Sequence, residues 1–361
     1  MSIVDVESFG FSSSWGDFIT YNRMLTWGTG GSYGNSGTLT IGNGGLLGDP
    51  TLTFGFGNGG YAANVSWQRR VLPGGPFQSG GKCIRFSTAP GAVGKIKWHD
   101  LINGVVHASV SFDGSTGIVR LYSGDMDNGG VLVIATALAQ FPINALFHAE
   151  AQISIGSGTS GSFALRLLGQ NLILNLTGIN TQTGSRALYD LTEFRIDGVG
   201  GQTLYCQHVL WYSLAGTVNT GWIGDRRVYG GVVVSNGDQN NFTPIGNAQN
   251  WQNVAENPPN VADYNESSTV GAIDLYKVTA PSNVTAVTAI MVSAICKKDD
   301  AGSRSTATLL KSGGVVGTGP TVALADSYTS QSNVWETDPS TGVAFVASAL
   351  NSIQPGIEVV A

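Results

Sequence analysis

Hydrophobic and polar residues alternate without interruption between Phe147 and Ile155. One face carries Phe147, Ala149, Ala151, Ile153 and Ile155, and the other carries His148, Glu150, Gln152 and Ser154. This period of two predicts a half-buried antiparallel strand. A glycine-rich turn at 156–161 leads to a second candidate at 163–168, and Gly169-Gln170 leads to a third at 172–176. The sequence therefore predicts a meander of three consecutive strands.

Similar short runs of β-branched and aromatic residues, each bounded by Gly, Asp, Asn or Pro, occur through the first two thirds of the chain. They span residues 38–41, 51–56, 82–87, 105–112, 118–122, 131–137, 191–196 and 205–212. No convincing amphipathic helix separates them. This arrangement predicts a sandwich of two β-sheets rather than a βαβ fold.

The last third of the chain also has strand patterns. Residues 287–298 and 303–311 are extended candidates, and Asp299-Asp300-Ala301-Gly302 lies where a hairpin would reverse the chain. We interpret the adjoining charges as a solvated hairpin tip rather than a binding site. A short helix around 346–353 and a final strand at 357–360 are expected to close this region.

Composition agrees with an all-β protein. Only 12% of the 361 residues are charged and 42% are hydrophobic, so the chain has enough apolar surface to fold. Its 51 glycines follow no three-residue period and indicate many tight turns rather than collagen. The length suits one large or two ordinary domains.

Charge and hydropathy argue against two classes of partner. The net charge is −6, and the 18 Lys and Arg residues form no basic stripe, so we expect no nucleic-acid partner. No run approaches the roughly 18 apolar residues that span a bilayer. The first seven residues are acidic where a signal peptide would be basic, so we expect no membrane insertion.

The cysteines, histidines and glycine-rich runs do not form a recognisable cofactor or metal motif. Cys83, Cys206 and Cys296 are far apart and are interpreted as reduced, buried thiols. A bridge between Cys83 and Cys206, or a bridge to a neighbouring subunit, is the alternative. The four histidines, His99, His107, His148 and His208, lack metal-binding spacing, and no Gly-x-Ser-x-Gly elbow or phosphate loop is present.

The acidic cluster Asp125-Met126-Asp127 is the nearest match to a catalytic carboxylate pair. Retaining glycosidases place two carboxyl groups about 5 Å apart, commonly at alternate strand positions. Here glycines follow at 129 and 130, and no third carboxylate follows at strand spacing. We interpret the cluster as a turn, with a weak calcium loop or a catalytic pair as alternatives. Replacing either Asp by Asn is then expected to change stability little.

Exposed aromatic rings are the usual platform for sugars in glycan-binding sandwiches. Five aromatic residues fall at or near candidate loops of the first domain: Trp15, Trp27, Tyr33, Trp67 and Trp98. Core packing accounts for most large aromatic residues. The sequence does not indicate which of the five, if any, would face a glycan.

Several spaced segments resemble the carboxyl-terminal module of a family of tailed-bacteriophage virion proteins. The resemblance covers roughly residues 219–361. It rests on Ser267-Ser268-Thr269-Val270-Gly271, Asp274-Leu275-Tyr276, residues 297–304, Glu336-Thr337-Asp338-Pro339 and Gly356-Ile357-Glu358-Val359-Val360. It implies a structural or adhesive component of a phage particle.

Two further stretches extend this resemblance. Asn175-Leu176-Thr177-Gly178-Ile179-Asn180-Thr181 is similar to a strand and turn of phage copies of the concanavalin A-like jelly roll. Residues 219–228 resemble the connector between such a jelly roll and the carboxyl-terminal module. The expected domains are a jelly roll at 1–224 and a smaller β-sandwich module at 225–361. Trp222, Asp225, Arg226 and Arg227 are the candidate junction residues, with Asp225 forming either an interdomain clamp or a plain surface ion pair.

The resemblance implies a non-enzymatic virion protein of the neck, collar, tail or head surface. It would be made in the host cytoplasm and would contact other virion proteins. Low charge and abundant apolar residues favour a cyclic homo-oligomer, most simply a trimer. A lectin that binds host surface polysaccharide is the alternative, and a polysaccharide depolymerase comes third. No catalytic, cofactor-binding or metal residue is assigned.

Overall fold

The computed structural model describes residues 3–7, 28–29, 38–42, 51–55, 63–72, 75–169, 171–198, 202–256, 260–282 and 284–361. In these ranges the regular secondary structure consists of antiparallel strands and two short 3-10 helices, which confirms the all-β prediction. The chain divides into two compact units. The first, here called the sandwich unit, ends at Val228, and the carboxyl-terminal unit comprises Tyr229–Ala361.

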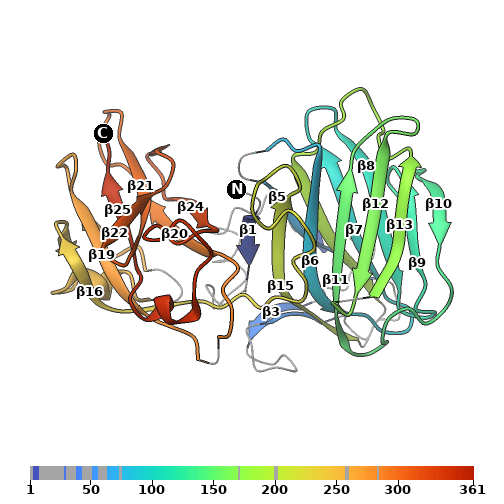
Figure 1. The fold of residues 1–361 in the computed structure, drawn as a ribbon, viewed down its shortest axis with the longest axis horizontal. Helices are drawn as coiled ribbons and strands as arrows, with labels where there is room; N and C mark the ends of the chain where they lie inside the picture. Colours follow the sequence, from blue (N-terminus) through green and yellow to red (C-terminus); the bar gives the residue numbers. More distant parts are fainter. Residues whose placement is uncertain are drawn as a thin grey trace. The chain divides into compact units, whose positions relative to one another are not determined.

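One sheet of the sandwich unit has eight strands, in the order β13-β12-β11-β6-β15-β4-β3, with β1 paired to β15 (Figure 1). Its strands are β1 (Ile3–Glu7), β3 (Thr38–Gly42), β4 (Thr51–Gly55), β6 (Ser79–Ser87), β11 (Leu146–Ser154), β12 (Gly161–Leu167), β13 (Asn171–Ile179) and β15 (Thr203–Ser213). Strands β11, β12 and β13 pair in succession, so the predicted meander is confirmed.

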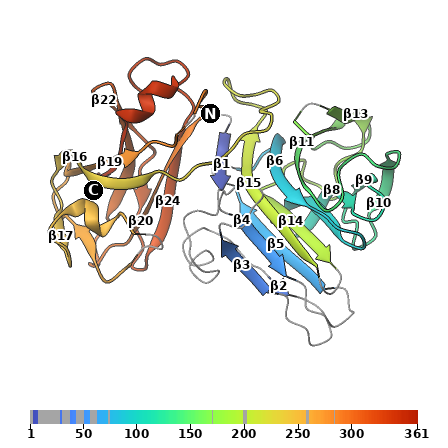
Figure 2. The ribbon, with the colours of Figure 1, turned by 90° about the horizontal axis from the view of Figure 1, so that it is seen from below.

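The second sheet has seven strands, in the order β10-β9-β8-β7-β14-β5-β2 (Figure 2). Its strands are β2 (Gly28–Thr29), β5 (Ala63–Val71), β7 (Val93–Asp100), β8 (Val105–Asp113), β9 (Val119–Ser123), β10 (Val131–Ala135) and β14 (Leu191–Gly198). The sequence patterns missed β5 and β7, and also β1 of the other sheet.

Aromatic side chains join the two sheets in the core of the sandwich unit. The Phe86 ring of β6 lies 5.1 Å from the Phe112 ring of β8 and 5.0 Å from the Phe194 ring of β14, centroid to centroid. Both contacts are edge-to-face, the favoured geometry for aromatic pairs. Across the same core the Trp211 indole donates to the Thr192 hydroxyl, which fixes β15 over β14.

Trp98, one of the five candidate sugar platforms, is part of this core. Its side chain is 0% exposed, and its ring packs edge-on against Phe163 at 5.9 Å. Its position on β7 therefore excludes a sugar-facing role. Trp15, Trp27, Tyr33 and the side chain of Trp67 lie outside the described residues.

The carboxyl-terminal unit contains one large sheet, in the order β16-β19-β25-β21-β22, with β23 paired to β21. Two strand pairs, β17-β18 and β20-β24, accompany it. The strands are β16 (Val232–Asn240), β17 (Thr243–Ile245), β18 (Tyr264–Glu266), β19 (Ile273–Thr279), β20 (Ile290–Cys296), β21 (Ser305–Ser312), β22 (Val315–Thr318), β23 (Val322–Ala323), β24 (Thr329–Trp335) and β25 (Gln354–Val359).

Two short 3-10 helices complete this unit, η1 (Asn250–Asn253) and η2 (Ala347–Asn351). The second occupies the position of the predicted helix, and its Leu350 packs in a small core with Val292, Leu310 and Phe345. Over the described ranges the structure contains no helix with the length and apolar character needed to span a membrane.

The predicted hairpin around Asp299–Gly302 is wrong. Strand β20 pairs with β24, whereas β21 pairs with β25, β22 and β23, so residues 299–302 carry the chain from one sheet to another. The loop is closed locally, because Asp300 accepts from the Gly302 N–H at 3.1 Å and pairs with Arg304. Local turn chemistry was correctly recognised, but it does not determine which strands pair.

A buried carboxylate organises the other end of the carboxyl-terminal unit. Asp274 is 0% exposed and accepts hydrogen bonds from the Phe242 N–H, the Asn250 amide and the Tyr276 hydroxyl, at 2.8, 2.6 and 3.0 Å. Asp274 of β19 thus joins this strand to the segment around residues 242–250.

We expect Asp274→Ala to destabilise the carboxyl-terminal unit by about 3–5 kcal/mol, because it leaves three donors without an acceptor. Thermal unfolding followed by circular dichroism measures this change. The exposed Asp299→Ala is the matched control and should differ from the wild type by less than about 0.5 kcal/mol. Equal stability of the two variants would contradict the proposed network.

Candidate functional site

The outer face of the seven-stranded sheet carries a row of charged side chains. On β7 the inward residues Ile96 and Trp98 alternate with Lys95 and Lys97, which point away from the core. On the neighbouring β14, Arg195 lies opposite Lys95, and Asp197 follows two residues later on the same face. The pleat of two paired strands thus gathers three cations in one place.

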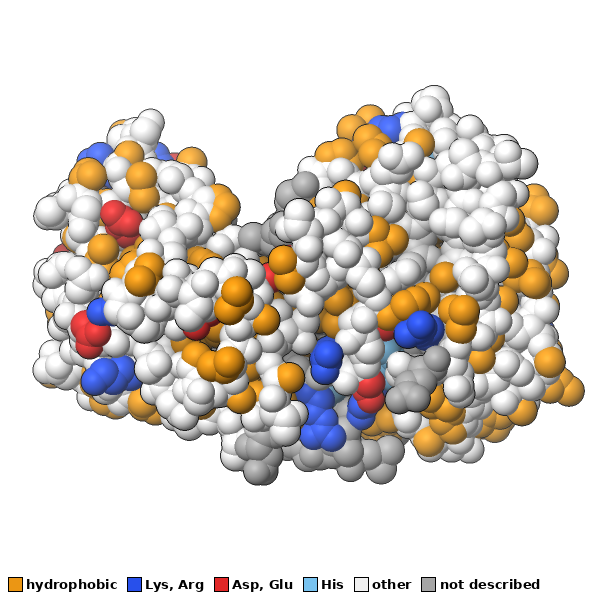
Figure 3. Space-filling view, in the orientation of Figure 1, with side chains coloured by type: hydrophobic (Ala, Val, Ile, Leu, Met, Phe, Trp, Pro, Cys, Tyr) orange, Lys and Arg blue, Asp and Glu red, His pale blue; other side chains and the backbone are white. Residues whose placement is uncertain are grey.

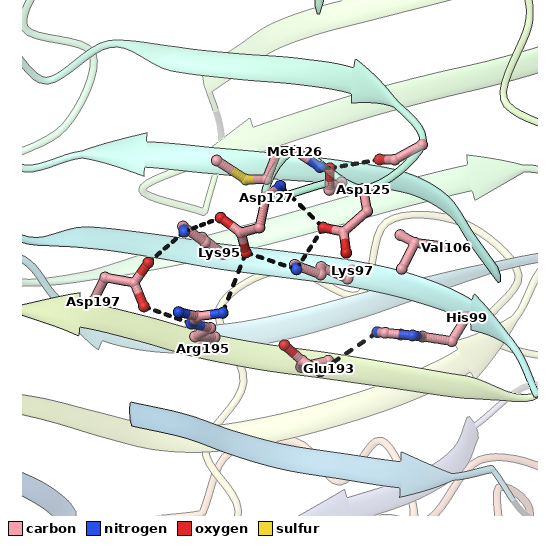
Figure 4. Close-up of polar contacts among 12 residues, drawn as sticks. Lys95, Lys97, His99, Val106, Asp125, Met126, Asp127, Glu193, Arg195 and Asp197 are labelled. Carbon is pink, nitrogen blue, oxygen red and sulfur yellow. Dashed lines mark hydrogen bonds and ion pairs between the residues drawn. The ribbon is translucent and has the colours of Figure 1, made fainter. Parts of the chain in front are cut away.

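The turn that contains Asp125 and Asp127 lies over these cations (Figure 4). Lys97 donates to Asp125 at 2.6 Å and to Asp127 at 2.7 Å. Lys95 donates to Asp127 and Asp197, and Arg195 contacts the same two carboxylates. Three cations therefore face three carboxylates, and the described cluster is electrically balanced.

Backbone contacts fix this turn. The Ser109 hydroxyl of β8 donates to the Gly124 carbonyl at 2.7 Å and accepts from the Met126 N–H at 3.0 Å. Gly129 has φ of 79°, which favours glycine, and the Gly130 N–H donates to the Asp125 carbonyl. Since lysines contact both carboxylates, these contacts favour the turn interpretation over a calcium loop or a catalytic pair.

The charge cluster changes the expected protonation of its members. Burial alone would raise the pKa of Asp127, but hydrogen bonds from Lys95 and Lys97 outweigh it and lower this pKa to about 2. Burial alone would lower the pKa of Lys97, but Asp125 and Asp127 raise it above its ordinary value. Ion pairing thus keeps both partners charged over the physiological range.

Next to this cluster, His99 and Glu193 form a further contact at 3.6 Å on the same face. Sequence reasoning missed the cationic members of the cluster and Asp197. The available signal was the alternation of polar Lys95, Lys97 and His99 with apolar Ile96 and Trp98. Because two of the polar positions are lysines, this segment was not predicted as a strand, although its alternation is regular.

The outer face of the eight-stranded sheet is covered by residues 219–228, here called the connector. The Glu150 carboxylate is 0% exposed and accepts from the backbone N–H groups of Ile223 and Gly224, at 2.7 and 2.9 Å. It also accepts from the Tyr212 hydroxyl at 2.7 Å. Two strands and the connector thus converge on one side chain.

The candidate junction residues lie along this connector. The Trp222 ring packs under the Arg166 guanidinium at 4.5 Å, and Asp225 pairs with Arg85 of β6. Burial would raise the pKa of Asp225, but Arg85 outweighs it and lowers this pKa. Arg226 and Arg227 are exposed. The ion pair of Asp225 therefore lies within the sandwich unit.

The end of the connector also belongs to this unit. The Val228 N–H donates to His208 at 3.2 Å, and the compact unit ends at Val228. The domain boundary expected from the sequence lies between residues 224 and 225. Contacts of Asp225 and Val228 with the sandwich sheet explain why the compact unit extends to Val228.

The connector buries part of the polar face of β11, which the alternating pattern predicts to be exposed to solvent. Its apolar face lies in the core as predicted, but His148 is only 4% exposed and Glu150 is 0% exposed. The strand is therefore buried on both faces over part of its length. No local pattern contains this information, because the covering segment lies about 70 residues further along the chain.

The structure also shows whether the cysteines are bridged and how His107 is held. Cys83 and Cys206 are buried and Cys296 is partly buried, and none of the three forms a disulfide bond, so the structure has no Cys83–Cys206 bridge. His107 is buried and contacts the Leu188 carbonyl at 3.0 Å and the Thr183 N–H at 3.1 Å. Burial lowers the pKa of His107, which keeps its imidazole neutral.

No protein-family model and no curated protein matches this chain. Several solved structures are similar to part of this chain. They include an alginate lyase from Aplysia kurodai (9% identity, TM-score 0.42, 59% of this chain and 100% of that one). A glucuronan lyase from Trichoderma reesei (12%, 0.37, 57% and 100%) and a carbohydrate-binding module from Bacillus subtilis (11%, 0.32, 53% and 98%) are further examples. At this identity, nothing about the chemistry of this chain follows from them.

The structure reverses the expectation for Asp127→Asn, because three cations would lose a common partner. We expect a loss of about 1–2 kcal/mol at pH 7, allowing for the partial exposure of the pairs. The wild type should lose this stabilisation as pH falls from about 4 to about 2, since the folded pKa of Asp127 is about 2. Denaturant unfolding at several pH values measures both effects.

The control is Asp326→Asn, whose carboxylate is 86% exposed and pairs only with Lys298 among the described ion pairs. It should leave stability within about 0.5 kcal/mol of the wild type. The charge-cluster interpretation is wrong if Asp127→Asn has the same stability and the same acid dependence as this control.

Proposed function

We propose that the protein is a non-enzymatic structural component of a tailed-phage particle that joins protein subunits through its β-sandwich surface. The resemblance of residues 219–361 to phage virion modules supports the particle assignment. The observation that carries the interaction role is the exposed edge strand β10. A location in the neck, collar, tail or head surface follows from the same resemblance.

Strand β10 is unusual for an unprotected sheet edge. Within the described residues it pairs only with β9 and ends the order of its sheet. Val131, Leu132 and Val133 are 70%, 50% and 38% exposed, and nearby Leu138 is 64% exposed. Hydrophobic side chains are visible at the margin of the space-filling view where Figure 1 places β10 (Figure 3).

The sequence of β10, Val-Leu-Val-Ile-Ala, contains no charge and no proline. Isolated edges are normally protected by Lys, Pro or inward charges, and unprotected apolar edges promote association. In the described strand, the only feature that could protect the edge in this way is a bulge between Leu132 and Ile134. The partner that best fits this surface is a further copy of the chain, because a ring of repeated subunits covers the same apolar surface on each copy.

The charged outer face of the seven-stranded sheet supports a non-enzymatic role. Lys95 and Lys97 are 7% and 5% exposed at their side chains, and each contacts two carboxylates. A general acid or base must reach its substrate directly or through one water. These groups would have to leave their partners before they could act.

We expect the wild-type protein to form a cyclic homo-oligomer at micromolar concentration, with a trimer favoured. Val131→Lys combined with Leu132→Lys should lower the mass to that of the 37.5 kDa monomer, because charges would be buried at the interface. Light scattering coupled to size-exclusion chromatography measures the mass. Val343→Lys is the control, since Val343 is 64% exposed but lies outside every strand of the described chain.

A monomeric wild type, or a double variant that keeps the wild-type mass, contradicts assembly through β10. The particle assignment has a separate test. Proteomics of purified phage with located density should place the chain in the virion. A positive glycan array would instead favour the lectin alternative, and polysaccharide turnover would favour the depolymerase.

A further inference from the structure

Three metal-binding side chains meet beneath the connector. Cys83 of β6 lies directly opposite Glu150 of β11, and His148 precedes Glu150 by two residues on the same face. Their ligand atoms, one sulfur, one imidazole nitrogen and one carboxylate oxygen, all lie within 4.8 Å of one another. All three residues are buried. Among the described residues, this is the one His, Cys, Asp and Glu cluster of that compactness.

His148 is the member of this cluster that lacks a partner. Its side chain is 96% buried, since only 4% is exposed, and neither ring nitrogen has a hydrogen-bond partner in the described structure. Buried polar groups are nearly always satisfied, and an orphan group costs free energy. A neutral imidazole with an unused nitrogen is the form that binds metal ions.

We propose that Cys83, His148 and Glu150 form a zinc site. A thiolate, an imidazole and a carboxylate are all ligands of Zn²⁺, and three protein ligands leave a fourth position for water. Binding displaces the thiol proton of Cys83 to solvent and forms a zinc–sulfur bond. The two negative ligands then balance the charge of the ion, which suits a buried position.

The geometry requires only a small contraction. Donor atoms in a tetrahedral zinc site are roughly 3.3–3.8 Å apart, given metal–ligand distances of about 2.0–2.3 Å. Because the donor atoms lie within 4.8 Å of one another, they would have to approach by at most about 1–1.5 Å. A bound dication stabilises the thiolate form of a coordinating cysteine.

The surroundings of Glu150 match those of a metal ligand held by outer hydrogen bonds. Its carboxylate accepts from the Tyr212 hydroxyl and from the N–H groups of Ile223 and Gly224. A carboxylate has about four acceptor positions, and the fourth position accepts from the Cys83 thiol, so loss of the thiol proton on binding frees this position for the ion. Partners of this kind fix the orientation of a ligand. The positive charge of nearby Arg85 is offset by its pairing with Asp225.

The position of the cluster predicts how the site behaves. The connector is hydrogen-bonded to Glu150 through the Ile223 and Gly224 N–H groups, so it lies against the cluster. We therefore expect slow metal exchange and a more rigid connector in the metal-bound protein.

The test uses Co²⁺ as a spectroscopic probe for zinc. Full-length protein, freed of metal by dialysis against a chelator, is titrated with Co²⁺ in weak buffer. We expect one equivalent to bind, with a thiolate-to-cobalt charge-transfer band in the near ultraviolet and release of about one proton per ion. Addition of Zn²⁺ should remove the cobalt bands.

Variants identify the ligands. Cys83→Ser should lose the charge-transfer band, and His148→Ala should bind at least about tenfold more weakly. Cys296→Ser is the matched control, because Cys296 is also a free thiol but lies in the carboxyl-terminal unit, and it should retain the band. Circular dichroism shows whether each variant is folded. If Cys83→Ser does not fold, the test is decided by comparing the wild type with Cys296→Ser. The quantities compared are the charge-transfer band and the number of protons released per ion.

The proposal is overturned if the folded wild type gives no charge-transfer band. It is also overturned if Cys83→Ser keeps the band, or if Cys296→Ser abolishes it.

Discussion

The sandwich unit depends on a buried carboxylate that needs donors from outside its own sheet. Glu150 projects from the face of β11 opposite the aromatic core, where water would normally solvate it. Here the Tyr212 hydroxyl and two backbone N–H groups of the connector replace water. Because removal of these donors would leave a charge buried, the connector and the sheet stabilise each other. The connector is therefore part of the sandwich rather than a free linker.

On the outer face of the seven-stranded sheet, buried charges are also satisfied by a covering segment. Here ion pairs take the place of the backbone donors. The turn at Asp125 and Asp127 covers Lys95, Lys97 and Arg195, which would otherwise be cations on a half-buried face. On both outer faces the buried or partly buried carboxylates are therefore paired with donors or cations of the same unit. Strand β10 differs from these faces because it carries three exposed large apolar side chains in succession at a sheet edge, and this feature underlies the proposal of a protein-interaction module.

The sequence predicted what depends on local pattern. Strict alternation identified β11 and its meander, and Asp300 with Gly302 identified a closed turn. Strand β7 was missed because Lys95 and Lys97 occupy its outer face, and their carboxylate partners lie about 30 and 100 residues away. The pairing of β20 and the burial of His148 likewise depend on distant segments. Long-range partners, rather than propensity, decide these features.

The most direct test of this account is amide hydrogen exchange at Ile223 and Gly224, compared between the wild type and Glu150→Ala. The account predicts that both amides are protected in the wild type and lose protection in the variant, while amides of β7 and β8 keep theirs. Rapid exchange of both amides in the folded wild type would contradict it, because the connector would then not be bound to the buried carboxylate.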